Sequence, residues 1–349
     1  MQQLTVNGVA IDDTFAEAFG MRATAIIITG PNRKWARQAA VTMTGFATSV
    51  IGCGCEAAID VELSPAQTPD GRPGCRVMLF AVSTDELQKQ VQNRLGQCVL
   101  TSPGSACFAD LNGGVADLKL GSALRYFGDG WQVSKKFGGR HFWRVPVMDG
   151  EFLCEATTGM TKSAVGGGNL LLVASSNAQA MAAAEAAVAA IEQVPGAIMP
   201  FPGGIVRSGS KVGGKYKGMM ASTNDAFAPT LRGVVKSALG PAGNAVLEIV
   251  IDGETSDAVA AAMKAGIGAV IALGPEEGAS RISAASASAS MAGRSARITT
   301  RPRNAGRRGR ARHARRDGGF ASRASVSGSR GVLIRRPCRA GCARCPAPS

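Results

Sequence analysis

The 349-residue sequence predicts an α+β protein with two lobes that repeat one order of elements. Three observations predict this fold class. Apolar and β-branched runs alternate with segments of helical spacing, the order strand-helix-strand-strand-helix-strand occurs twice, and Gly- and Pro-rich turns separate the elements. The length suits about two domains, and 45% hydrophobic with 18% charged residues is a composition typical of globular chains.

The first half contains one set of six elements. Ser83 is a good N-cap for the second helix, and the Pro- and Gly-rich residues 65–74 predict a turn between the two middle strands. In chain order, the expected elements are a strand at 23–28, a helix at 34–44, strands at 55–63 and 76–82, a helix at 85–95 and a short strand at 98–101.

The second half repeats this order, with a long Gly-rich insertion after its second strand. The expected elements are a strand at 169–174, a helix at 177–192, strands at 197–200 and 245–251, a helix at 256–265 and a last strand at 279–283. This is the pattern of the split βαβ, or ferredoxin-like, unit used twice, with mostly antiparallel sheets. We therefore expect one lobe over 1–147 and a second over 148–285.

The positive charge is confined to the end of the chain. Residues 286–349 contain sixteen arginines, no lysine and one acid, which leaves 23 basic and 24 acidic residues before them. The net charge of +14 therefore indicates polyanion binding by this tail alone. Its Arg-, Ala-, Ser-, Gly- and Pro-rich composition predicts disorder. Arginine without lysine indicates a frameshift product of a G+C-rich gene, and a genuine basic tail is the alternative.

The expected compartment is the reducing cytoplasm. Nine cysteines at irregular spacing do not form a disulfide framework. Residues 1–13 lack the basic and apolar regions of a signal peptide, and no run of about 18 apolar residues predicts a membrane span.

His141 is the one histidine before the tail. We expect an ordinary strand residue there, which argues against multi-His metal chemistry.

Two short motifs carry weak signals. Residues 209–215 (GSKVGGK) have the spacing of a phosphate-binding loop, but Tyr216 stands where a Ser or Thr would bind magnesium. A Gly-rich loop that lines a substrate cleft is the favoured interpretation. Cys338, Cys342 and Cys345 have part of a metal-ligand spacing without a fourth ligand. No metal site is therefore expected.

Glu248 is the acidic residue that the pattern singles out, because it stands in the apolar run AVLEIVID. Alternation places it on one strand face with Val246 and Val250, while Leu247 and Ile249 lie on the other. Burial raises the pKa of a carboxyl group, which can then donate a hydrogen bond in its protonated form. The alternative is an ordinary strand residue that faces solvent.

Eight longer segments are more specific than these motifs. They are DDTFAEAFGMRATAIIITG (12–30), ELSPAQTPDGRPG (62–74), GQCVLTSPGSACF (96–108), RYFGDGW (125–131), RVPVMDGEF (144–152), PFPGGIVRSGSKVG (200–213), ASTNDAFAP (221–229) and AVLEIVIDG (245–253). Together they resemble the formylmethanofuran–tetrahydromethanopterin formyltransferases, over about residues 5–284.

The resemblance implies two ferredoxin-like lobes and formyl transfer between the amine of methanofuran and a ring nitrogen of tetrahydromethanopterin in one-carbon metabolism. Both molecules are co-substrates, and no metal or prosthetic group is implied. The implied partners are further copies in a homo-oligomer (dimer or tetramer), or the subunits of a formyltransferase/hydrolase complex, with no membrane and no specific nucleic acid. One alternative is a non-catalytic structural subunit of that complex, and another is nonspecific polyanion binding through the tail.

The resemblance also places a strand glutamate, here Glu248, as hydrogen-bond donor to a tetrahedral oxyanion, a role typically worth ~3–4 kcal/mol. Two large substrates additionally need a shaped cleft that aligns them. The residues expected to line it are Gln97, Ser105, Gly203, Gly204, Ser208, Ser210 and Lys211. The alternative is that the glycines only form turns and that Lys211 is a solvated surface charge.

Overall fold

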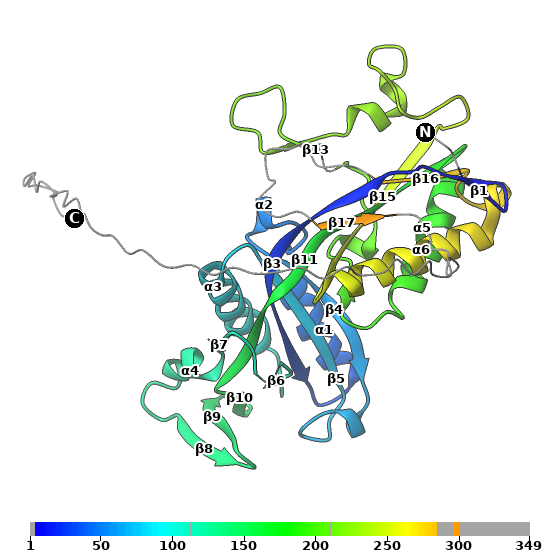
Figure 1. Ribbon diagram of the computed structural model, residues 1–349. Helices are drawn as coiled ribbons and strands as arrows, with labels where there is room; N and C mark the ends of the chain where they lie inside the picture. Colours follow the sequence, from blue (N-terminus) through cyan, green and yellow to red (C-terminus); the bar gives the residue numbers. More distant parts are fainter. Residues whose placement is uncertain (1–3, 112, 210, 285–295, 300–349) are drawn as a thin grey trace, which may run out of the picture. The chain divides into compact units, whose positions relative to one another are not determined.

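Two long strands, β3 (Phe15–Thr29) and β11 (Thr157–Ala174), pair with each other and connect the two halves of the chain. In this computed structural model they belong to a mixed α/β fold that is mostly sheet (Figure 1). The structure describes residues 4–111, 113–209, 211–284 and 296–299. These residues belong to one compact unit, Met1–Arg303.

The Arg-rich tail predicted to be disordered, residues 286–349, lies outside the described residues except for one strand. This strand, β17 (Ala296–Thr299), pairs antiparallel with the first part of β3, at a place where the sequence predicted no element. The three tail cysteines of the C-x3-C-x2-C cluster also lie outside the described residues.

The first lobe is an antiparallel sheet with two helices on one face. The strands lie in the order β4 (Glu56–Leu63), β5 (Gly74–Ala81), β3 and β6 (Ala106–Ala109), and the helices are α1 (Arg33–Thr44) and α3 (Thr84–Arg94). Ser83 caps α3, because its hydroxyl accepts a hydrogen bond from the Glu86 N–H at 3.2 Å. The predictions of both helices and of the Ser83 cap are confirmed.

The prediction of a short strand at 98–101 is wrong. Residues Leu95–Val99 (η2) instead continue α3 as a wider helical turn, in which the Leu100 N–H donates to the Leu95 carbonyl at 2.9 Å. Leu95 and Val99 are fully buried in the core beneath α1 and α3. A short apolar run does not distinguish a strand from a buried helical turn. The strand that completes the sheet, β6, begins at Ala106.

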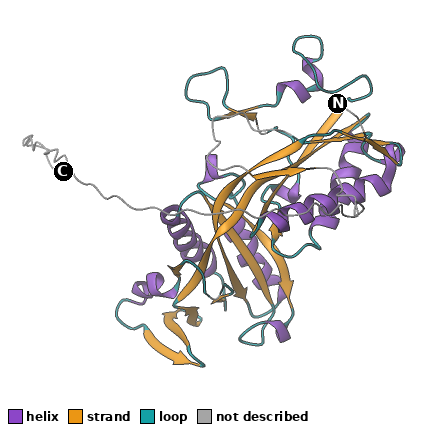
Figure 2. Cartoon of the chain, in the orientation of Figure 1, coloured by secondary structure: helices purple, strands orange, loops and turns teal. Residues whose placement is uncertain are grey.

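The second lobe repeats the arrangement. Its strands lie in the order β12 (Ala197–Ile198), β15 (Ala245–Gly253), β11 and β16 (Arg281–Ser283), all antiparallel, with α5 (Asn177–Ile191) and α6 (Ser256–Glu277) on one face. Figure 2 shows α5 and α6 side by side. All six strands and helices predicted for this half are confirmed, although β12 is only two residues long.

The N-terminal strands join this second sheet. Strand β2 (Val9–Ile11) pairs parallel with β16, and β1 (Leu4–Val6) pairs with β2. Val9 and Ile11 are buried in the same apolar cluster as α5 and α6. The first residues of the chain therefore stabilise the lobe that is built mainly from its second half.

Helix α6 extends to Glu277, beyond the predicted end at residue 265. Among the described helices it is the one long and apolar enough to cross a membrane, by length and composition. Its buried residues Val259, Met263 and Val270 pack into the core cluster of the second lobe, as in a core helix. Gly274, at φ +76°, and Pro275 interrupt its last turn.

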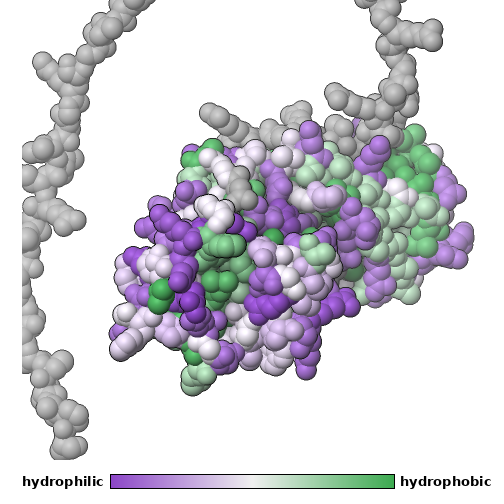
Figure 3. Space-filling model, turned by 90° about the horizontal axis from the view of Figure 1, so that it is seen from below, coloured by the Kyte–Doolittle hydropathy of each residue, from purple (hydrophilic) through white to green (hydrophobic). Residues whose placement is uncertain are grey.

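A hairpin arm extends from the first lobe. Strand β10 (Gly150–Glu155) pairs parallel with β6 and antiparallel with β9 (Arg140–Val147), which pairs with β8 (Val133–Phe137). The segment around it exposes large apolar side chains: Tyr126, Phe127, Trp131, Phe137 and Met148. The arm is at the bottom of Figure 1, on the face that Figure 3 shows from below, where green apolar surface lies among purple hydrophilic surface.

Short elements complete the described chain. In the first half they are α2 (Val50–Cys53), η1 (Pro65–Gln67), β7 (Ala116–Lys119), which pairs with β11, α4 (Gly121–Leu124) and η3 (Arg125–Gly128). In the Gly-rich insertion they are η4 (Pro202–Gly204), β13 (Lys211–Val212), β14 (Ala221–Ser222), η5 (Asp225–Phe227) and η6 (Pro229–Leu231).

The helix-free faces of the two sheets meet in a small apolar layer between the lobes. Alternation on β5 directs Val77 and Leu79 to the helices and Met78 and Phe80 to this layer. There they meet Met21 of β3, Ala164 of β11 and Ile198 of β12. The layer is thin, so a small change in one side chain is transmitted to both lobes.

We expect Gly166→Ala to destabilise the junction of β3 and β11. A Cβ at Gly166 would overlap the Met21 sulfur and lie 2.9 Å from Asp252 Oδ1. Overpacking of this kind should lower the unfolding free energy by about 2 kcal/mol, measured by chemical denaturation. Gly20→Ala is the matched control, because a Cβ at Gly20, on the partner strand, meets nothing within 4 Å. Equal stability of the two variants would contradict the close packing described here.

Candidate functional site

Glu248 lies in the middle of β15, in register with Leu171 of β11. Ile249 and Ile251 face the helices, as alternation predicts, and Glu248 points to the opposite face. Its side chain is only 3% exposed. The alternative of a solvent-facing glutamate is therefore wrong, and this carboxyl group is buried.

Two contacts hold this glutamate in place. The Asn169 amide donates a hydrogen bond to Glu248 Oε1 at 3.0 Å, and Asn169 is itself 7% exposed. The backbone of Glu248 exchanges two hydrogen bonds with Val206, at 2.7 and 2.9 Å. Sequence reasoning missed Asn169, although an amide in the apolar run NLLLVA was the available signal. The second contact ties the Gly-rich insertion to β15.

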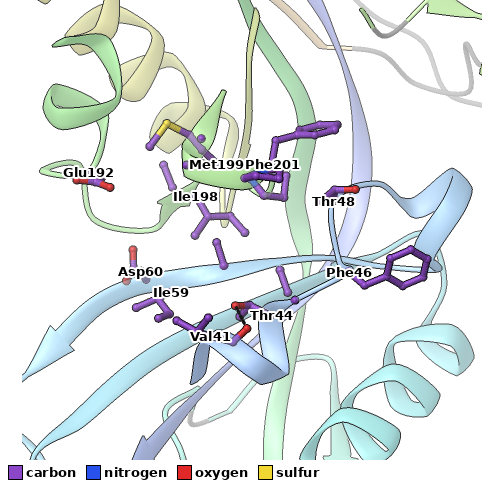
Figure 4. A pocket seen from close by; sticks show the side chains of 18 residues that line it. Val41, Thr44, Phe46, Thr48, Ile59, Asp60, Glu192, Ile198, Met199 and Phe201 are labelled. Atoms are coloured by element: carbon purple, nitrogen blue, oxygen red, sulfur yellow. Dashed lines mark hydrogen bonds between the residues drawn. The ribbon is translucent and has the colours of Figure 1, made fainter. Parts of the chain in front are cut away.

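A cavity of about 380 Å³ opens between the lobes (Figure 4). Its walls come from residues between 41 and 48 at the end of α1 and just after it, residues 57–60 of β4, Glu192 and residues 197–204. Gly203 and Gly204, both predicted cleft residues, line it with φ values of +62° and +78°, which favour glycine. Gly204 precedes Val206, the backbone partner of Glu248, by two residues.

Phe46 is a second residue that sequence reasoning missed. It lines the cavity, is 78% exposed, and has a φ of +53°, a conformation that a bulky residue rarely adopts. Figure 4 shows its ring at the cavity together with Phe201 from the other lobe. Strained backbone at a cavity is a recognised sign of a binding site. The Gly45-Phe46 sequence by itself carries no such signal.

A charged cluster supports the cavity wall formed by β4. Arg76 of β5 binds three carboxylates, with distances of 2.5 Å to Asp60, 2.6 Å to Asp110 and 2.6 Å to Glu254. Burial lowers the pKa of Arg76, but the hydrogen bonds to the three carboxylates outweigh burial and raise it. Because Glu254 follows β15 directly, this cluster also connects the two lobes.

The other predicted cleft residues lie in different surroundings. Ser208 is exposed, and Lys211 forms an exposed ion pair with Asp225 at 2.6 Å. Gln97 is exposed on η2, and Ser105 is buried with its hydroxyl bonded to the Val99 carbonyl at 2.5 Å. These four do not line the cavity. Ser210 lies outside the described residues.

The described residues offer little for metal or thiol chemistry. Among them, no three His, Cys, Asp or Glu side chains gather as a metal site. Their cysteines are free thiols, and burial raises the pKa of Cys55 and of Cys75 to about 11. His141 lies in β9, as predicted, with Nε2 at 2.8 Å from the Ser134 hydroxyl. The buried carboxyl group of Glu248 is thus the main chemical feature of this part of the chain.

Comparisons with known proteins agree with this two-lobed architecture. A family model described as formylmethanofuran–tetrahydromethanopterin formyltransferase matches residues 4–147, and a model of the proximal lobe of the same proteins matches residues 150–293. The formylmethanofuran–tetrahydromethanopterin formyltransferase of Methylococcus capsulatus is 60% identical over 281 residues, which cover 80% of this chain and 94% of the relative.

Two solved structures are also similar. One is a chain of the formyltransferase/hydrolase complex of Methylorubrum extorquens with methylofuran, with a TM-score of 0.82, 53% identity, and coverage of 85% of this chain and 98% of that one. The other is the formyltransferase of Methanosarcina barkeri, with a TM-score of 0.78, 40% identity, and coverage of 84% and 99%.

Fold and site together define a two-lobed α/β protein with an interlobe cavity and a buried strand glutamate. The matches over both lobes identify the family. The chain belongs to the formylmethanofuran–tetrahydromethanopterin formyltransferases, as the resemblance of the eight segments implied.

We expect Arg76→Met to weaken the lobe junction. The change leaves Asp60, Asp110 and Glu254 without their cation, and broken pairs of this partly buried kind cost about 2–4 kcal/mol in unfolding free energy. Arg33→Met is the matched control, because the Arg33 side chain is 81% exposed in its pair with Glu62. Thermal unfolding should separate the two variants. An equal melting temperature would show that the Arg76 cluster contributes nothing to stability.

Proposed function

We propose that this chain transfers a formyl group between methanofuran and tetrahydromethanopterin in one-carbon metabolism. The observation that carries the proposal is the buried Glu248, whose backbone partner Val206 follows the cavity-lining Gly204 by two residues, in a chain that belongs to this family. A nitrogen of tetrahydromethanopterin bonds to the formyl carbon, and the bond from that carbon to the methanofuran nitrogen breaks. The leaving nitrogen takes up a proton, and the attacking nitrogen loses one.

Glu248 acts as a neutral hydrogen-bond donor to the oxyanion of the tetrahedral intermediate. Its low exposure favours the uncharged carboxyl, because burial disfavours the charged form. The Asn169 amide donates to Oε1, so the proposal places the proton of the neutral carboxyl on Oε2. Asn169 is therefore a positioning residue for the proposed donor.

The interlobe cavity is part of the cleft that aligns the two substrates. Gly203 and Gly204 allow the chain to turn at its wall without side chains, and Phe46 offers an aromatic face. The remaining loop residues Ser208, Ser210 and Lys211 follow directly in the insertion and stay candidates for substrate contacts. Gln97 and Ser105 stay candidates for a part of the cleft beyond this cavity. Methanofuran and tetrahydromethanopterin are co-substrates, and the reaction needs no resident cofactor.

Glu248 variants test the proposal with an assay of formyl transfer from formylmethanofuran to tetrahydromethanopterin. Glu248→Ala should lower kcat by about 10²–10³-fold, because it removes the oxyanion donor. Glu248→Gln keeps a donor that does not titrate, so it should retain more activity than the alanine variant. The rate of the unaltered protein should fall as pH rises and Glu248 ionises, whereas the rate of the glutamine variant should not.

Glu185→Gln on the exposed face of α5 is the matched control and should behave like the unaltered protein. An unchanged rate and pH profile in Glu248→Gln, together with an active Glu248→Ala, would remove Glu248 from the chemistry. A folded but inactive unaltered protein would favour the non-catalytic structural subunit.

The same proposal includes the architecture of the lobes. Each is a ferredoxin-like unit, because the sheet orders β4-β5-β3-β6 and β12-β15-β11-β16 both place the first and third strands of a βαββαβ set in the centre. Along the chain we divide the lobes at 1–147 and 148–285, a division that the family matches at 4–147 and 150–293 support, while β1 and β2 add to the second sheet and β10 to the first.

For partners, we propose either a homo-oligomer (dimer or tetramer) or the subunits of a formyltransferase/hydrolase complex, in the cytoplasm. The apolar side chains exposed around the β8–β9 arm support burial against another subunit. Similarity to a chain of the Methylorubrum extorquens complex supports the second form. Light scattering of the purified chain, alone and with candidate subunits, separates the two, and a monomer under all conditions would contradict both.

The Arg-rich tail after about residue 285 is, in our proposal, a frameshift product. Sixteen arginines without a lysine support it, as does a family match that ends at residue 293. The pairing of β17 with β3 supports the alternative of a genuine tail. The chain translated from the corrected frame should transfer formyl faster than both the full chain and a chain ending at residue 285. Resequencing that finds an intact frame through Ser349 would overturn the proposal.

A further inference from the structure

A pair of carboxyl groups crosses the apolar layer between the lobes. Glu56 begins β4 in the first lobe, and Asp252 lies near the end of β15 in the second. Glu56 is 5% exposed and Asp252 is completely buried. Both side chains face the apolar layer, because each is in register with a residue of that layer, and the charge of Glu56 acts on Asp252. Neither residue belongs to the oxyanion site proposed above.

The surroundings of the pair are apolar. Glu56 is in register with Phe80 of β5, and Asp252 with Ile198 of β12, and both partners belong to the interlobe layer. Asp252 Oδ1 also lies against Gly166 of β11, where a Cβ would come within 2.9 Å. Two ionised carboxylates in such a place would repel each other strongly, because the local dielectric constant is low.

Backbone groups supply most of the remaining polar contacts. The Val50 N–H donates to Glu56 Oε1 at 3.0 Å, and the Gly167 N–H faces Asp252. Within the described part of the chain, neither Asp252 oxygen receives a full hydrogen bond from an N–H or hydroxyl donor. The Glu56 carboxyl is therefore the group that completes the surroundings of Asp252.

Cations on the neighbouring elements are directed elsewhere. Arg76 of β5 binds Asp60, Asp110 and Glu254. Arg22 of β3 donates to its own neighbouring carbonyl, and Lys162 of β11 is exposed.

Among the described residues, the other titratable groups on these elements are acids and thiols, which give the pair no counter-ion. Glu248 stands four residues before Asp252 on β15, and Glu62 pairs with Arg33 at the far end of β4. The thiol of Cys53 in α2 contacts Thr48.

The direction of both pKa shifts agrees with this geometry. Burial, followed by the charge of Glu56 and the hydrogen bond with it, raises the pKa of Asp252 well above its usual range, and the Gly167 N–H opposes this. Burial also raises the pKa of Glu56, whereas hydrogen bonds from Asp252 and Val50 oppose it. Both shifts favour a pair of carboxyl groups that together keep a proton.

We propose that Glu56 and Asp252 share one proton at neutral pH and act as a clamp between the lobes, which is released when that proton is lost. The clamp sets the width of the interlobe cavity, because Ala57 and Ile198, adjacent to the pair in sequence and register, form opposite walls of it. The inference does not depend on the proposed function.

The pair makes stability depend on pH in a defined sense. The folded protein binds the shared proton more tightly than the unfolded chain, so stability falls as pH rises above the ordinary range of a free carboxyl group, until the pair has lost its proton. Asp252→Asn keeps a donor toward Glu56 that cannot titrate. In the full chain, the melting temperature should therefore fall by about 5 °C more in the unaltered protein than in Asp252→Asn between pH 6 and pH 9.

Glu62→Gln, at a half-buried carboxyl group on the same strand that is paired with Arg33 and Arg37, is the matched control and should keep the full fall with pH. Hydrogen exchange of peptides that cover residues 56–60 and 197–204 locates the effect. At pH 9 these peptides should exchange faster in the unaltered protein than in Asp252→Asn, and at pH 6 equally fast. Parallel melting curves of the two proteins across this pH range would overturn the proposal.

Infrared difference spectra keep the test independent of unfolding. The spectrum of the unaltered protein minus that of Asp252→Asn at pH 7 should contain the carbonyl band of a protonated carboxyl group, and a band from ionised carboxylate alone would contradict the shared proton.

A bound cation is the alternative explanation for two neighbouring buried acids. Saturable stabilisation by Mg²⁺, Ca²⁺ or Zn²⁺ that is lost in Asp252→Asn would replace the clamp with a cation site.

Discussion

The antiparallel pairing of β3 with β11 is the constraint on which the rest of the structure depends. Each strand is central in the sheet of one lobe and continues into the other lobe, so backbone hydrogen bonds join the two sheets. Small residues make the crossing possible. Met21 and Asp252 leave no room for a side chain at position 166, and Val259 leaves none at position 168, so glycines stand there. The position of β15, and with it the candidate site, follows from this junction.

Polar groups near the junction serve three different purposes. Arg76 compensates three carboxylates and joins β5 to the segment after β15. Glu248 is held by an amide and by the backbone of the Gly-rich insertion, an arrangement suited to a preorganised hydrogen-bond donor. Among the described residues, Glu56 and Asp252 have no cation beside them. The first cluster stabilises by charge pairing, whereas the proposed roles of the other two depend on an uncharged carboxyl group.

Local patterns in the sequence predicted most elements, because caps and periodicity act over a few residues. Ser83 and the spacing of α1 and α5 are examples, and strand alternation gave the correct face for Glu248. Pairing between distant parts of the chain left no such signal. The pairing of β2 with β16 and the proximity of Glu56 to Asp252 were therefore not predicted. The strand prediction at 98–101 was wrong for a different reason. A buried helical turn and a buried strand require the same apolar residue types, so the run could not distinguish them.

The most direct measurement follows the formyl carbon itself. Formylmethanofuran labelled with ¹³C in its formyl group is mixed with tetrahydromethanopterin and the purified protein, as the full chain and from the corrected reading frame, and the label is followed by NMR. The account predicts that the label moves to a nitrogen of tetrahydromethanopterin in at least the second form, without an appearance of formate. A label that stays on methanofuran with both forms folded would contradict it.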